Sequence, residues 1–384
     1  MMPRRRSKAI RVGDVTIGGD APIVVQSMTK TFTHDVQATV REIRRMEERG
    51  CEIVRVAVPD MPSAEAIPQI KKHVRIPIIA DIHFHYQLAL AALDGGIDGL
   101  RLNPGNIRNA EQVSTVVKKA KERQVPIRVG VNFGSLPPVS MIGKDYTSGK
   151  VVSRLEDGVN TLAKVGEESP DGYTLVDHMV DTAMWEIGIL EDLDFDLIKI
   201  SLKAFDVPTT IEVYKRIAEM IPYPLHLGIT EAGTPKSGAI RSAVGLGTLL
   251  YMGIGDTIRV SLAGDPSEEV DAGYEILKSL NLRSKGATLI ACPSCGRADV
   301  DIRALADTVD HRLREMGRDL DIKIAVMGCE VNGPGEAKDA DVGIAAGKGR
   351  AVIFSKGKKV RVIQEADFFP ALMEEIDKLA PASN

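Results

Sequence analysis

Residues 126–132 read Pro-Ile-Arg-Val-Gly-Val-Asn, a short β-branched run in which every second residue from Arg128 onward is polar or glycine. Successive side chains of a β-strand point to opposite faces, so Arg128, Gly130 and Asn132 share one face and the apolar residues between them share the other. Similar runs recur along the first part of the chain and predict further strands at Pro22–Met28, Glu52–Val58, Pro77–Ile82, Gly99–Asn103, Leu197–Lys203, Pro224–Thr230 and Thr257–Leu262.

Amphipathic segments separate these strands and give the chain a repeating βα pattern. Residues 110–123, 210–220 and 267–280 carry apolar side chains at helical spacing. The strands begin about 25 to 30 residues apart, the length of one βα unit, except across Leu136–Tyr173, which we interpret as an insertion. Eight such units predict an α/β fold, a closed (β/α)8 TIM barrel over residues 1–280. An open doubly wound sheet is the alternative, but no G-x-G-x-x-G follows the first strand.

The pattern changes after a polar linker at residues 281–286, Asn-Leu-Arg-Ser-Lys-Gly. Two amphipathic segments, Val300–Met316 and Ala366–Leu379, then alternate with Gly-punctuated strands. These strands are predicted at Ala287–Ala291, Asp321–Met327, Val342–Ala346, Ala351–Phe354 and Val360–Ile363. Residues 287–384 therefore predict a smaller α+β domain, and residues 281–286 predict a hinge between the two domains.

Composition excludes several classes of protein. Hydrophobic residues make up 44% of the chain and charged residues 27%, which are ordinary values for a folded globular protein. A net charge of −4 provides no general attraction to nucleic acid or to an anionic membrane. The basic N-terminus lacks the apolar run of a signal peptide, and no segment reaches the roughly 18 apolar residues of a membrane helix. Four cysteines do not indicate a disulfide scaffold, so we predict a cytoplasmic protein.

Cations recur on the polar faces of the predicted barrel strands, late in each strand. They are Arg55, Arg101, Arg128, Lys203 and Arg259. The apolar faces suit the surrounding helices, so the cations should point into the barrel, near the C-terminal strand ends where barrel active sites lie. Buried like charges are costly without an anion, and several arginines favour a substrate with more than one phosphate. The polar residues expected to assist are Asn103, Asn132, Ser201, Thr230 and Ser261.

Other features of the barrel also bear on its chemistry. Glu231, in Gly-Ile-Thr-Glu-Ala-Gly just past the seventh strand, is the carboxylate best placed for proton transfer. Lys203 could instead form a Schiff base, as in aldolases, because cationic neighbours lower the pKa of a lysine. His83 and His85 could suggest a metal site, but too few acidic partners recur on the other strands to favour one.

Three of the four cysteines lie in the second domain. Cys292 and Cys295 form a C-x-x-C pair, and Cys329 stands in Gly-Cys-Glu, whereas Cys51 leads into an apolar strand and is interpreted as a small buried residue. Glu336, in a Gly-Pro-Gly turn that can fold back, offers a fourth ligand. Zinc would accept three thiolates and one oxygen, and an iron–sulfur cubane would hold one iron weakly through the carboxylate. The spacing alone does not choose between them.

The segments around these cysteines carry a specific resemblance. Ala291–Arg297 (Ala-Cys-Pro-Ser-Cys-Gly-Arg) and Val326–Ala337 (Val-Met-Gly-Cys-Glu-Val-Asn-Gly-Pro-Gly-Glu-Ala) are similar to the bacterial 4-hydroxy-3-methylbut-2-enyl diphosphate synthases. These are enzymes of the methylerythritol phosphate route to isoprenoids. Val25–Thr29, Leu100–Asn106 and Arg128–Asn132 resemble the same family, so the likeness runs nearly from end to end.

The resemblance implies a chemistry for both domains. It implies a [4Fe–4S] cluster on Cys292, Cys295, Cys329 and Glu336. It also implies an oxidoreductase that reductively opens and dehydroxylates 2-C-methyl-D-erythritol 2,4-cyclodiphosphate to 4-hydroxy-3-methylbut-2-enyl diphosphate. Glu336 would yield its iron to a substrate oxygen, and Glu231 is the expected proton donor. Because the sequence shows no nicotinamide or flavin fingerprint, the electrons are expected from a ferredoxin or flavodoxin.

Barrel geometry predicts the assembly. Each helix of a βα barrel runs antiparallel to its strand, so the eighth helix brings the chain to the end opposite the phosphate site. A linker of about six residues spans at most about 20 Å. We therefore expect a homodimer in which each cluster domain caps the barrel of its partner, and the resemblance points to the same arrangement.

Other functions are weighed against this one. The alternative enzyme is a Schiff-base aldolase acting through Lys203 on a phosphorylated substrate, with a zinc-stabilised C-terminal domain. A nucleic-acid-binding protein with a zinc-knuckle-like tail is disfavoured because no basic–aromatic stripe surrounds the cysteines. A radical S-adenosylmethionine enzyme is disfavoured because no three cysteines show the C-x-x-x-C-x-x-C spacing.

Overall fold

The computed structural model describes residues 1–107, 109–137, 142, 173–283, 286–294, 300–316, 320–329, 338–347 and 349–379. The chain divides into two compact units, Met1–Arg283 and Ser284–Asn384. Most of the predicted insertion, Leu136–Tyr173, lies outside the described residues, as do the predicted cluster ligands Cys295 and Glu336.

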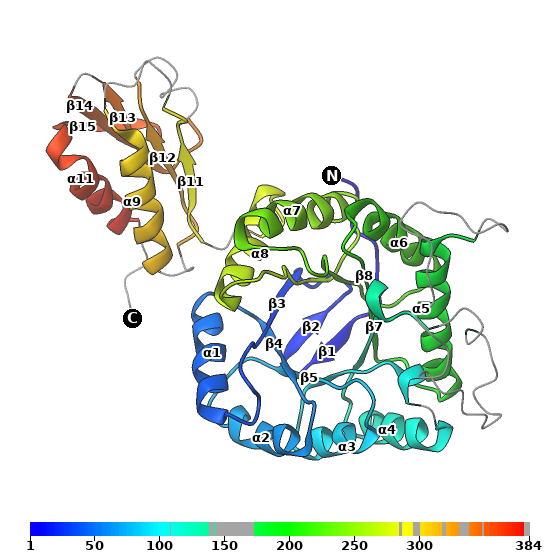
Figure 1. Ribbon diagram of the computed structural model, residues 1–384. Helices are drawn as coiled ribbons and strands as arrows, with labels where there is room; N and C mark the ends of the chain where they lie inside the picture. The colour runs from blue at the N-terminus through cyan, green and yellow to red at the C-terminus, as the bar shows by residue number, and fades with distance from the viewer. Residues whose placement is uncertain are drawn as a thin grey trace. The chain divides into compact units, whose positions relative to one another are not determined.

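The first unit is a closed parallel barrel, as the sequence predicts (Figure 1). Its strands follow the order β8-β7-β6-β5-β4-β3-β10-β9, and a parallel bridge between Ile200 and Leu225 joins the two ends of that order. Their bounds are β3 (Val24–Met28), β4 (Ile53–Ala57), β5 (Ile78–Asp81), β6 (Gly99–Arg101), β7 (Ile127–Asn132), β8 (Ile198–Lys203), β9 (His226–Leu227) and β10 (Thr257–Ile258).

A ring of helices surrounds the strands (Figure 1). The helices are α1 (Val36–Glu48), α2 (Met61–Lys71), α3 (Tyr86–Asp94), α4 (Ala110–Glu122), α5 (Leu175–Asp192), α6 (Val207–Met220), α7 (Pro235–Tyr251) and α8 (Pro266–Ser279). Side-chain caps fix several starts: Asp206, for example, accepts from the backbone N of Thr209 at the start of α6. The apolar core lies between the helices and the outer faces of the strands. Of the helices that the structure describes, none is long and apolar enough to cross a membrane.

The last two barrel strands are shorter than predicted. The runs expected at Pro224–Thr230 and Thr257–Leu262 form regular strand only over two residues each, in β9 and β10. Past Leu227 the backbone turns through Glu231 and Gly233, which have positive φ angles of 52° and 117°. Past Ile258, the backbone N of Leu262 donates to a side chain, Oε1 of Glu269, at 3.1 Å. Alternation of apolar and polar residues therefore predicts which side chains of these segments face the barrel interior. It does not predict the residue at which strand pairing ends.

An N-terminal hairpin that the sequence analysis did not anticipate fills one end of the barrel. It consists of β1 (Ile10–Val12) and β2 (Val15–Ile17), paired antiparallel. Their buried residues Ile10, Val12 and Ile17 pack against Val24, Ile53 and Ile79, each at or near the start of a barrel strand. The interior is therefore apolar at the end that the hairpin fills.

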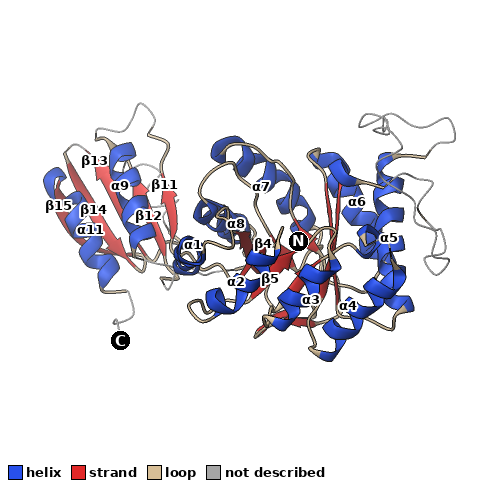
Figure 2. Ribbon diagram, turned by 60° about the horizontal axis from the view of Figure 1, so that its bottom comes forward, coloured by secondary structure: helices blue, strands red, loops and turns tan. Residues whose placement is uncertain are grey.

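The second unit is an α+β domain with one mixed sheet. The sheet has the order β11-β12-β13-β14-β15; the first three strands are parallel and the last two pairings are antiparallel. Of the described part of this unit, helices α9 and α11 pack on one face of the sheet (Figure 2). The bounds are β11 (Thr288–Ala291), α9 (Ile302–Glu315), β12 (Lys323–Met327), β13 (Val342–Gly347), β14 (Arg350–Ser355), β15 (Lys358–Gln364) and α11 (Phe368–Asp377).

Candidate functional site

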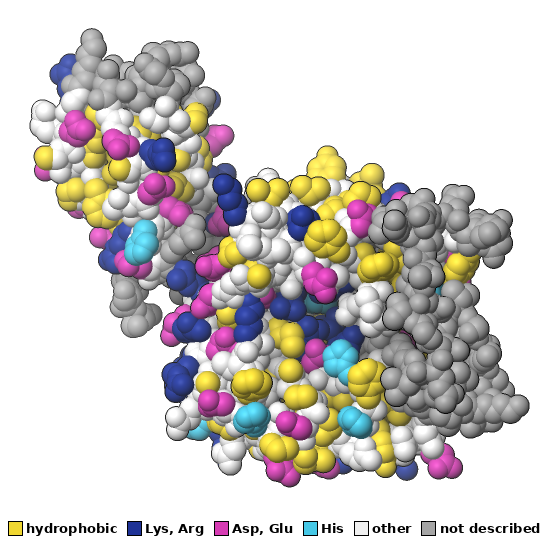
Figure 3. Space-filling view, viewed as in Figure 1, with side chains coloured by type: hydrophobic (Ala, Val, Ile, Leu, Met, Phe, Trp, Pro, Cys, Tyr) yellow, Lys and Arg dark blue, Asp and Glu magenta, His cyan; other side chains and the backbone are white. Residues whose placement is uncertain are grey.

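The cations predicted from strand alternation gather inside the barrel near its mouth. Arg101, Lys203 and Arg259 lie at the C-terminal ends of their strands, whereas Arg55 is in the middle of β4 and Arg128 is the second residue of β7. Figure 3 shows Lys and Arg side chains together in a hollow near the centre of this face. Arg101 and Arg128 are each 3% exposed, and Lys203 is 7% exposed. Arg55 interacts electrostatically with Arg101 and Arg259, and Lys203 with Arg128 and Arg259. The structure thus brings all five predicted cations into one cluster.

Asp81, at the end of β5, is a carboxylate within this cluster. Its Oδ2 lies 3.5 Å from Nε of Arg55, and its Oδ1 lies 3.5 Å from Nη1 of Arg101. Burial acts to raise the pKa of Asp81, but Arg55, Arg101 and Arg128 outweigh it and hold the pKa below its ordinary value. Asp81 therefore remains ionised and offsets part of the positive charge.

Glu269 is the second carboxylate, and it reaches the cluster from α8. Its Oε2 lies 3.2 Å from Nε of Arg259 and accepts from the hydroxyl of Ser27 at 2.9 Å. Its Oε1 lies 3.4 Å from Nζ of Lys30. The sequence analysis missed Glu269 and Lys30, although a glutamate on the buried face of an amphipathic helix, beside Val270 and Gly273, is a readable signal.

A neutral acceptor also touches the cluster. The sulfur of Met28, at the end of β3, accepts from Nε and Nη2 of Arg55 at 3.2 and 2.9 Å. A thioether is a weak acceptor without charge. It therefore orients the guanidinium of Arg55 without neutralising it, and the charge of Arg55 stays available to an anion.

Positive charge is in excess at this site, and burial acts against it. Burial, with help from Arg259 and Arg101, lowers the pKa of Arg55 to about 10, although Asp81 opposes the shift. Burial followed by Arg128 and Arg55 lowers the pKa of Lys199 to about 7. Among the described residues, neither Nζ of Lys199 nor Nε of Arg128 has a hydrogen-bond partner. The buried cations have lost the water that would solvate them. A bound polyanion would replace that solvation, so such a site favours binding of a polyanion.

The predicted amides and hydroxyls are placed in different ways. Asn103 is held by backbone: its Nδ2 donates to Gly130 O at 3.0 Å, and Gly130 N donates to its Oδ1 at 2.8 Å. Ser201 accepts from Nη1 of Arg128 at 2.5 Å. A Cβ at position 130 would lie 2.9 Å from Nε of Arg101, so glycine is required there. Asn103 and Gly130 thus fix the distance between β6 and β7, which carry Arg101 and Arg128.

The rim of the mouth carries the other predicted residues. Asn132, Thr230 and Ser261 are half-buried at the ends of their strands, and Glu231 is exposed. Glu231 has a φ of 52°, in the left-handed region that non-glycine residues seldom adopt. The turn leaves the Glu231 side chain exposed to solvent at the rim. His83, also at the rim, lies with Nδ1 2.9 Å from Nη1 of Arg101.

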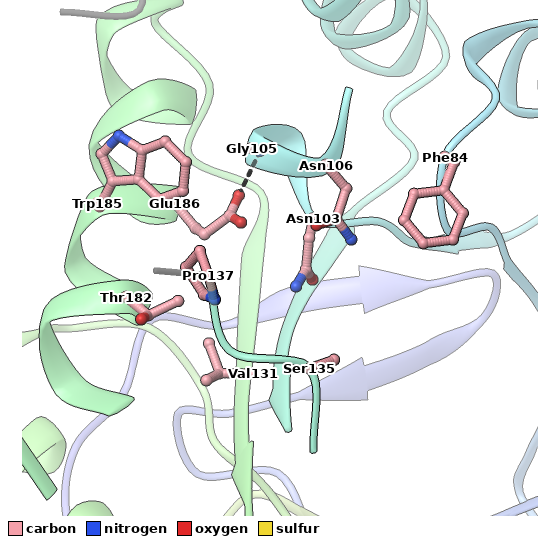
Figure 4. Close-up of a pocket in the computed structure, with 10 residues that line it drawn as sticks. All are labelled: Phe84, Asn103, Gly105, Asn106, Val131, Ser135, Pro137, Thr182, Trp185 and Glu186. Carbon is pink, nitrogen blue, oxygen red and sulfur yellow. Dashed lines mark hydrogen bonds between the residues drawn. The ribbon is translucent and has the colours of Figure 1, made fainter. Parts of the chain in front are cut away.

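A small pocket opens beside the mouth, between the β6–α4 connection and α5 (Figure 4). Asn103, Gly105 and Trp185 are among its lining residues. Oε2 of Glu186 accepts from the backbone N of Gly105 at 2.6 Å, and a Cβ at position 105 would lie 2.5 Å from the ring of Trp185. Helix α5 therefore clamps the loop that follows Asn103. The sequence analysis missed Glu186, which, like Glu269, is an acid on the buried face of a helix.

The described cysteines of the second unit lie at one end of its sheet. Strands β11 and β12 are parallel neighbours, with Ala291 beside Val326. Cys292 follows β11 directly, its backbone N donating to Val326 O at 2.9 Å, and Cys329 comes two residues after β12. Two thiols thus lie just past the C-terminal ends of adjacent strands. Thiolates are ligands suited to soft metals and iron–sulfur clusters. In contrast, burial raises the pKa of Cys51 to about 12, so this thiol stays protonated in the barrel core.

Comparisons with known proteins cover both units. The model of the GcpE TIM-barrel domain matches residues 7–274, and that of the GcpE protein C-terminal domain matches residues 288–378. A protein of Dehalococcoides mccartyi is 56% identical over 379 residues, covering 99% of this chain and 100% of that protein. Proteins of Geobacillus kaustophilus and Geobacter sulfurreducens are each 51% identical, covering 98% of this chain and 93% and 98% of theirs. All three are named 4-hydroxy-3-methylbut-2-en-1-yl diphosphate synthase (flavodoxin).

Proposed function

The chain belongs to the GcpE family of 4-hydroxy-3-methylbut-2-en-1-yl diphosphate synthases and is an enzyme, and from this premise we propose its reaction. The substrate is 2-C-methyl-D-erythritol 2,4-cyclodiphosphate. Two electrons and two protons enter, a ring C–O bond and a C–O bond to a hydroxyl break, and water leaves with 4-hydroxy-3-methylbut-2-enyl diphosphate as product. The observation that carries the proposal is the buried cluster of arginines and lysines at the barrel mouth, with Asp81 and Glu269 as the carboxylates it contains.

The cation cluster binds the diphosphate in this proposal. Arg55, Arg101, Arg128, Lys203 and Arg259 hold its oxygens, and Asn132, Ser201, Thr230 and Ser261 add hydrogen bonds at the strand ends. Guanidinium groups match phosphate oxygens with paired donors. Asn103 acts from behind, because its amide is already bonded to Gly130 and sets the spacing of the strands. A diphosphate held in this way directs the carbon skeleton toward the rim.

Glu231 supplies the proton in this proposal. Two features of Glu231 support this role: it lies at the rim, and its φ of 52° is a left-handed conformation with a steric cost for glutamate. An exposed carboxylate there can exchange protons with water before the site closes. The carboxyl group of Glu231 can then donate its proton to the oxygen of the departing hydroxyl group.

The second unit holds a [4Fe–4S] cluster through Cys292, Cys295, Cys329 and Glu336 in this proposal. The two cysteines at one sheet edge support it, and the family to which the chain belongs favours iron–sulfur over zinc. When bound, such a cluster supplies electrons one at a time. The electron donor is a flavodoxin, as the names of the relatives state for those proteins, or a ferredoxin of similar potential. The Schiff-base aldolase with a zinc-stabilised domain is not retained, because no relative named above is an aldolase.

The two units have separate roles, and two copies of the chain complete each site. Residues 1–280 bind substrate, 281–286 form a hinge, and 287–384 carry the cluster. Nη1 of Arg283 donates to Ile23 O at 2.7 Å, and Nη2 lies 3.1 Å from Oε1 of Glu52; Ile23 and Glu52 immediately precede β3 and β4. The chain is thus anchored at the floor of the barrel, and the few residues from Arg283 to Thr288 span at most about 18 Å. Such a tether favours a homodimer in which each cluster domain caps the mouth of its partner.

The test is anaerobic purification followed by metal and sulfide analysis, an optical spectrum and a turnover assay. We expect about four irons and four sulfides per chain, as for a [4Fe–4S] centre, and a broad charge-transfer absorption. With dithionite-reduced methyl viologen and the cyclodiphosphate, mass spectrometry should show the linear diphosphate. A protein that binds one zinc and no iron, or a reduced iron–sulfur protein that leaves the cyclodiphosphate unchanged, would contradict the proposal.

A further inference from the structure

Lys199 is a buried lysine of the barrel interior to which the proposed reaction gives no role. It is the second residue of β8, on the same face of the strand as Ser201 and Lys203, and it pairs in register with Arg128 of β7. Because the strands run from the floor of the barrel toward its mouth, Lys199 lies deeper than Ser201 and Lys203. It is therefore on the floor side of the groups that are proposed to hold the diphosphate.

The amino group of Lys199 is enclosed by the protein. Lys199 is 2% exposed, and its Nζ has no hydrogen-bond partner among the described residues. An ammonium group has three N–H donors, and burying it without partners is far more costly than burying a neutral amine. Burial, followed by Arg128 and Arg55, lowers the pKa of Lys199 to about 7. Above pH 7 the ligand-free protein therefore holds Lys199 mainly as a neutral amine.

Gln26 adds unused hydrogen-bonding capacity to the same interior. It shares a face of β3 with Val24, whose side chain packs against the N-terminal hairpin inside the barrel. Gln26 is 1% exposed, and in the part of the chain that the structure describes neither its Oε1 nor its Nε2 has a hydrogen-bond partner. An amide oxygen accepts hydrogen bonds from ammonium groups. The barrel interior thus contains an acceptor for positive charge that the ligand-free chain leaves unused.

Most of the described charged groups around Lys199 are positive. Arg128 and Arg55 disfavour a charge on this lysine, whereas Asp256, which precedes β10, favours one. His226 of β9 also interacts electrostatically with Lys199, and the buried side chains of the hairpin are apolar. The other charged or titratable groups in the interior or at its mouth are Lys30, Asp81, His83, Arg101, Lys203, Arg259 and Glu269. Among these described groups, basic residues outnumber carboxylates until an anion binds.

We propose that Lys199 takes up one proton from solution when a diphosphate binds in the barrel. This coupling rests on the diphosphate site proposed above. Phosphate oxygens held by Arg55 and Arg128 place negative charge beside the two cations that oppose a charge on the lysine, and this raises the pKa of Lys199. The proton leaves a buffer acid and adds to the lone pair of Nζ, so no bond of the diphosphate breaks and no electron is transferred. Lys199 thus contributes a positive charge only when an anion is present to balance it.

Proton uptake makes the affinity for the anion depend on pH. A proton that is bound together with the ligand weakens binding as the pH rises, by up to about tenfold per pH unit. The cyclodiphosphate has one strongly acidic group on each phosphorus, and both stay ionised from about pH 7 to 9, so the ligand itself does not titrate. Lys203 and His226 can also take up protons, because their pKa values are lowered in the ligand-free protein. The share of Lys199 is therefore the difference between the wild type and a variant of this residue.

The experiment is calorimetric titration of the anaerobic holoenzyme with the cyclodiphosphate, without a reductant, at about pH 8 in buffers of different ionisation enthalpy. Lys199→Met removes the amine, and Lys199→Arg keeps a cation that takes up no proton. Lys215→Met, on the exposed part of α6, is the matched control. With a pKa of about 7, Lys199 is about one-tenth charged at about pH 8, so both Lys199 variants should take up about 0.9 fewer protons per site than the wild type and the control. Between about pH 7.5 and 8.5 the dissociation constant should rise roughly eightfold more in the wild type than in Lys199→Met.

Proton counting separates this coupling from the diphosphate site on which it rests. A wild-type protein that binds the cyclodiphosphate without taking up protons would overturn the coupling and leave the site intact. Equal proton numbers in the wild type and the two Lys199 variants would do the same. A wild-type protein that does not bind the cyclodiphosphate would overturn the site and the coupling with it. If Lys199→Met does not fold, Lys199→Arg gives the same comparison.

Discussion

Nζ of Lys203 lies 3.2 Å from Nε2 of His226 inside the barrel, and Nδ1 of the same ring lies 2.7 Å from Oγ1 of Thr257. Burial, followed by neighbouring cations, lowers the pKa of both Lys203 and His226 well below their ordinary values. Because His226 is neutral, it can accept a hydrogen bond from the amino group of Lys203. This contact fixes the lysine in the cluster at a place where a bound diphosphate would restore its charge.

Lys203→Ala should therefore weaken anion binding without unfolding the barrel. The loss of one charge-assisted hydrogen bond costs about 1.5–3 kcal/mol, so the dissociation constant for pyrophosphate should rise roughly tenfold to a hundredfold. The melting temperature should stay equal or rise, because burial and the neighbouring cations already disfavour a charged lysine at this place. Calorimetric titration and thermal unfolding measure the two effects. Unchanged affinity in Lys203→Ala and in Arg101→Ala would show that phosphate binds elsewhere.

Glu269→Gln should be among the most destabilising polar substitutions in the barrel. Its carboxylate is fully buried and lies next to Arg259 and Lys30. Removing one partner of a buried ion pair leaves the other charge uncompensated and costs about 3–5 kcal/mol. The adjacent Glu268 is exposed, so Glu268→Gln is a matched control that should change stability by less than about 0.5 kcal/mol. Urea unfolding compares the two, and equal effects would contradict the role assigned to Glu269.

The stability of the ligand-free protein should depend on pH through Lys199. Burial, with Arg128 and Arg55, lowers its pKa to about 7 against the opposing effect of Asp256. Between pH 7 and the ordinary lysine pKa of 10.5, the unfolded chain binds a proton that the folded chain lacks, so the free energy of unfolding rises with pH. The contribution is at most about 1.4 kcal/mol per pH unit. Lys199→Met should reduce this slope in urea unfolding across pH 7 to 10, and identical slopes would argue against a neutral lysine.

Cluster assembly should separate the cysteines into two classes. Cys292→Ser, Cys295→Ser and Cys329→Ser should each lose most of the iron, because a thiolate ligand is replaced by a hydroxyl. Cys51→Ala should retain its iron, since the Cys51 thiol is buried in the barrel and its pKa is raised to about 12. Glu336→Ala should keep much of the iron but lose turnover. Iron analysis of anaerobically purified variants decides the matter, and loss of iron in Cys51→Ala alone would reverse the assignment.

Mixed dimers test whether each site draws on two chains. A Cys329→Ser chain lacks a cluster, and an Arg101→Ala chain lacks a complete phosphate site, so each should be inactive alone. After subunit exchange, one of the two sites in a mixed dimer has both an intact barrel and an intact cluster. Turnover should return to at most about a quarter of the wild-type value, because random exchange makes half of the dimers mixed. No recovery after confirmed exchange would rule out a site shared between chains.

Strand alternation was sufficient to predict the barrel and the cation cluster because both depend on a local period of two residues. Arg101 and Arg128 stand on neighbouring strands, and the period alone puts them on the inner face. The carboxylates that balance them were not predicted, because Glu269 reaches the site from a helix and Asp81 is a single acid at the end of an apolar strand. The hairpin that fills the barrel floor was missed because Ile10, Val12 and Ile17 form strands too short to show a period. The positions of these carboxylates and of the hairpin depend on tertiary packing, which the periodicity of the sequence does not reveal.

The hairpin β1–β2 also determines the order in which molecules move. Its apolar residues occupy the end of the barrel at which the strands begin, so in the part of the chain that the structure describes this end is closed to substrate. A substrate bound by the cation cluster would then enter from the end where the strands finish, and the product would leave by the same end. Product release would then have to precede the binding of the next substrate. In the reaction proposed above, a diphosphate product that leaves slowly would therefore compete with new substrate for the cation cluster.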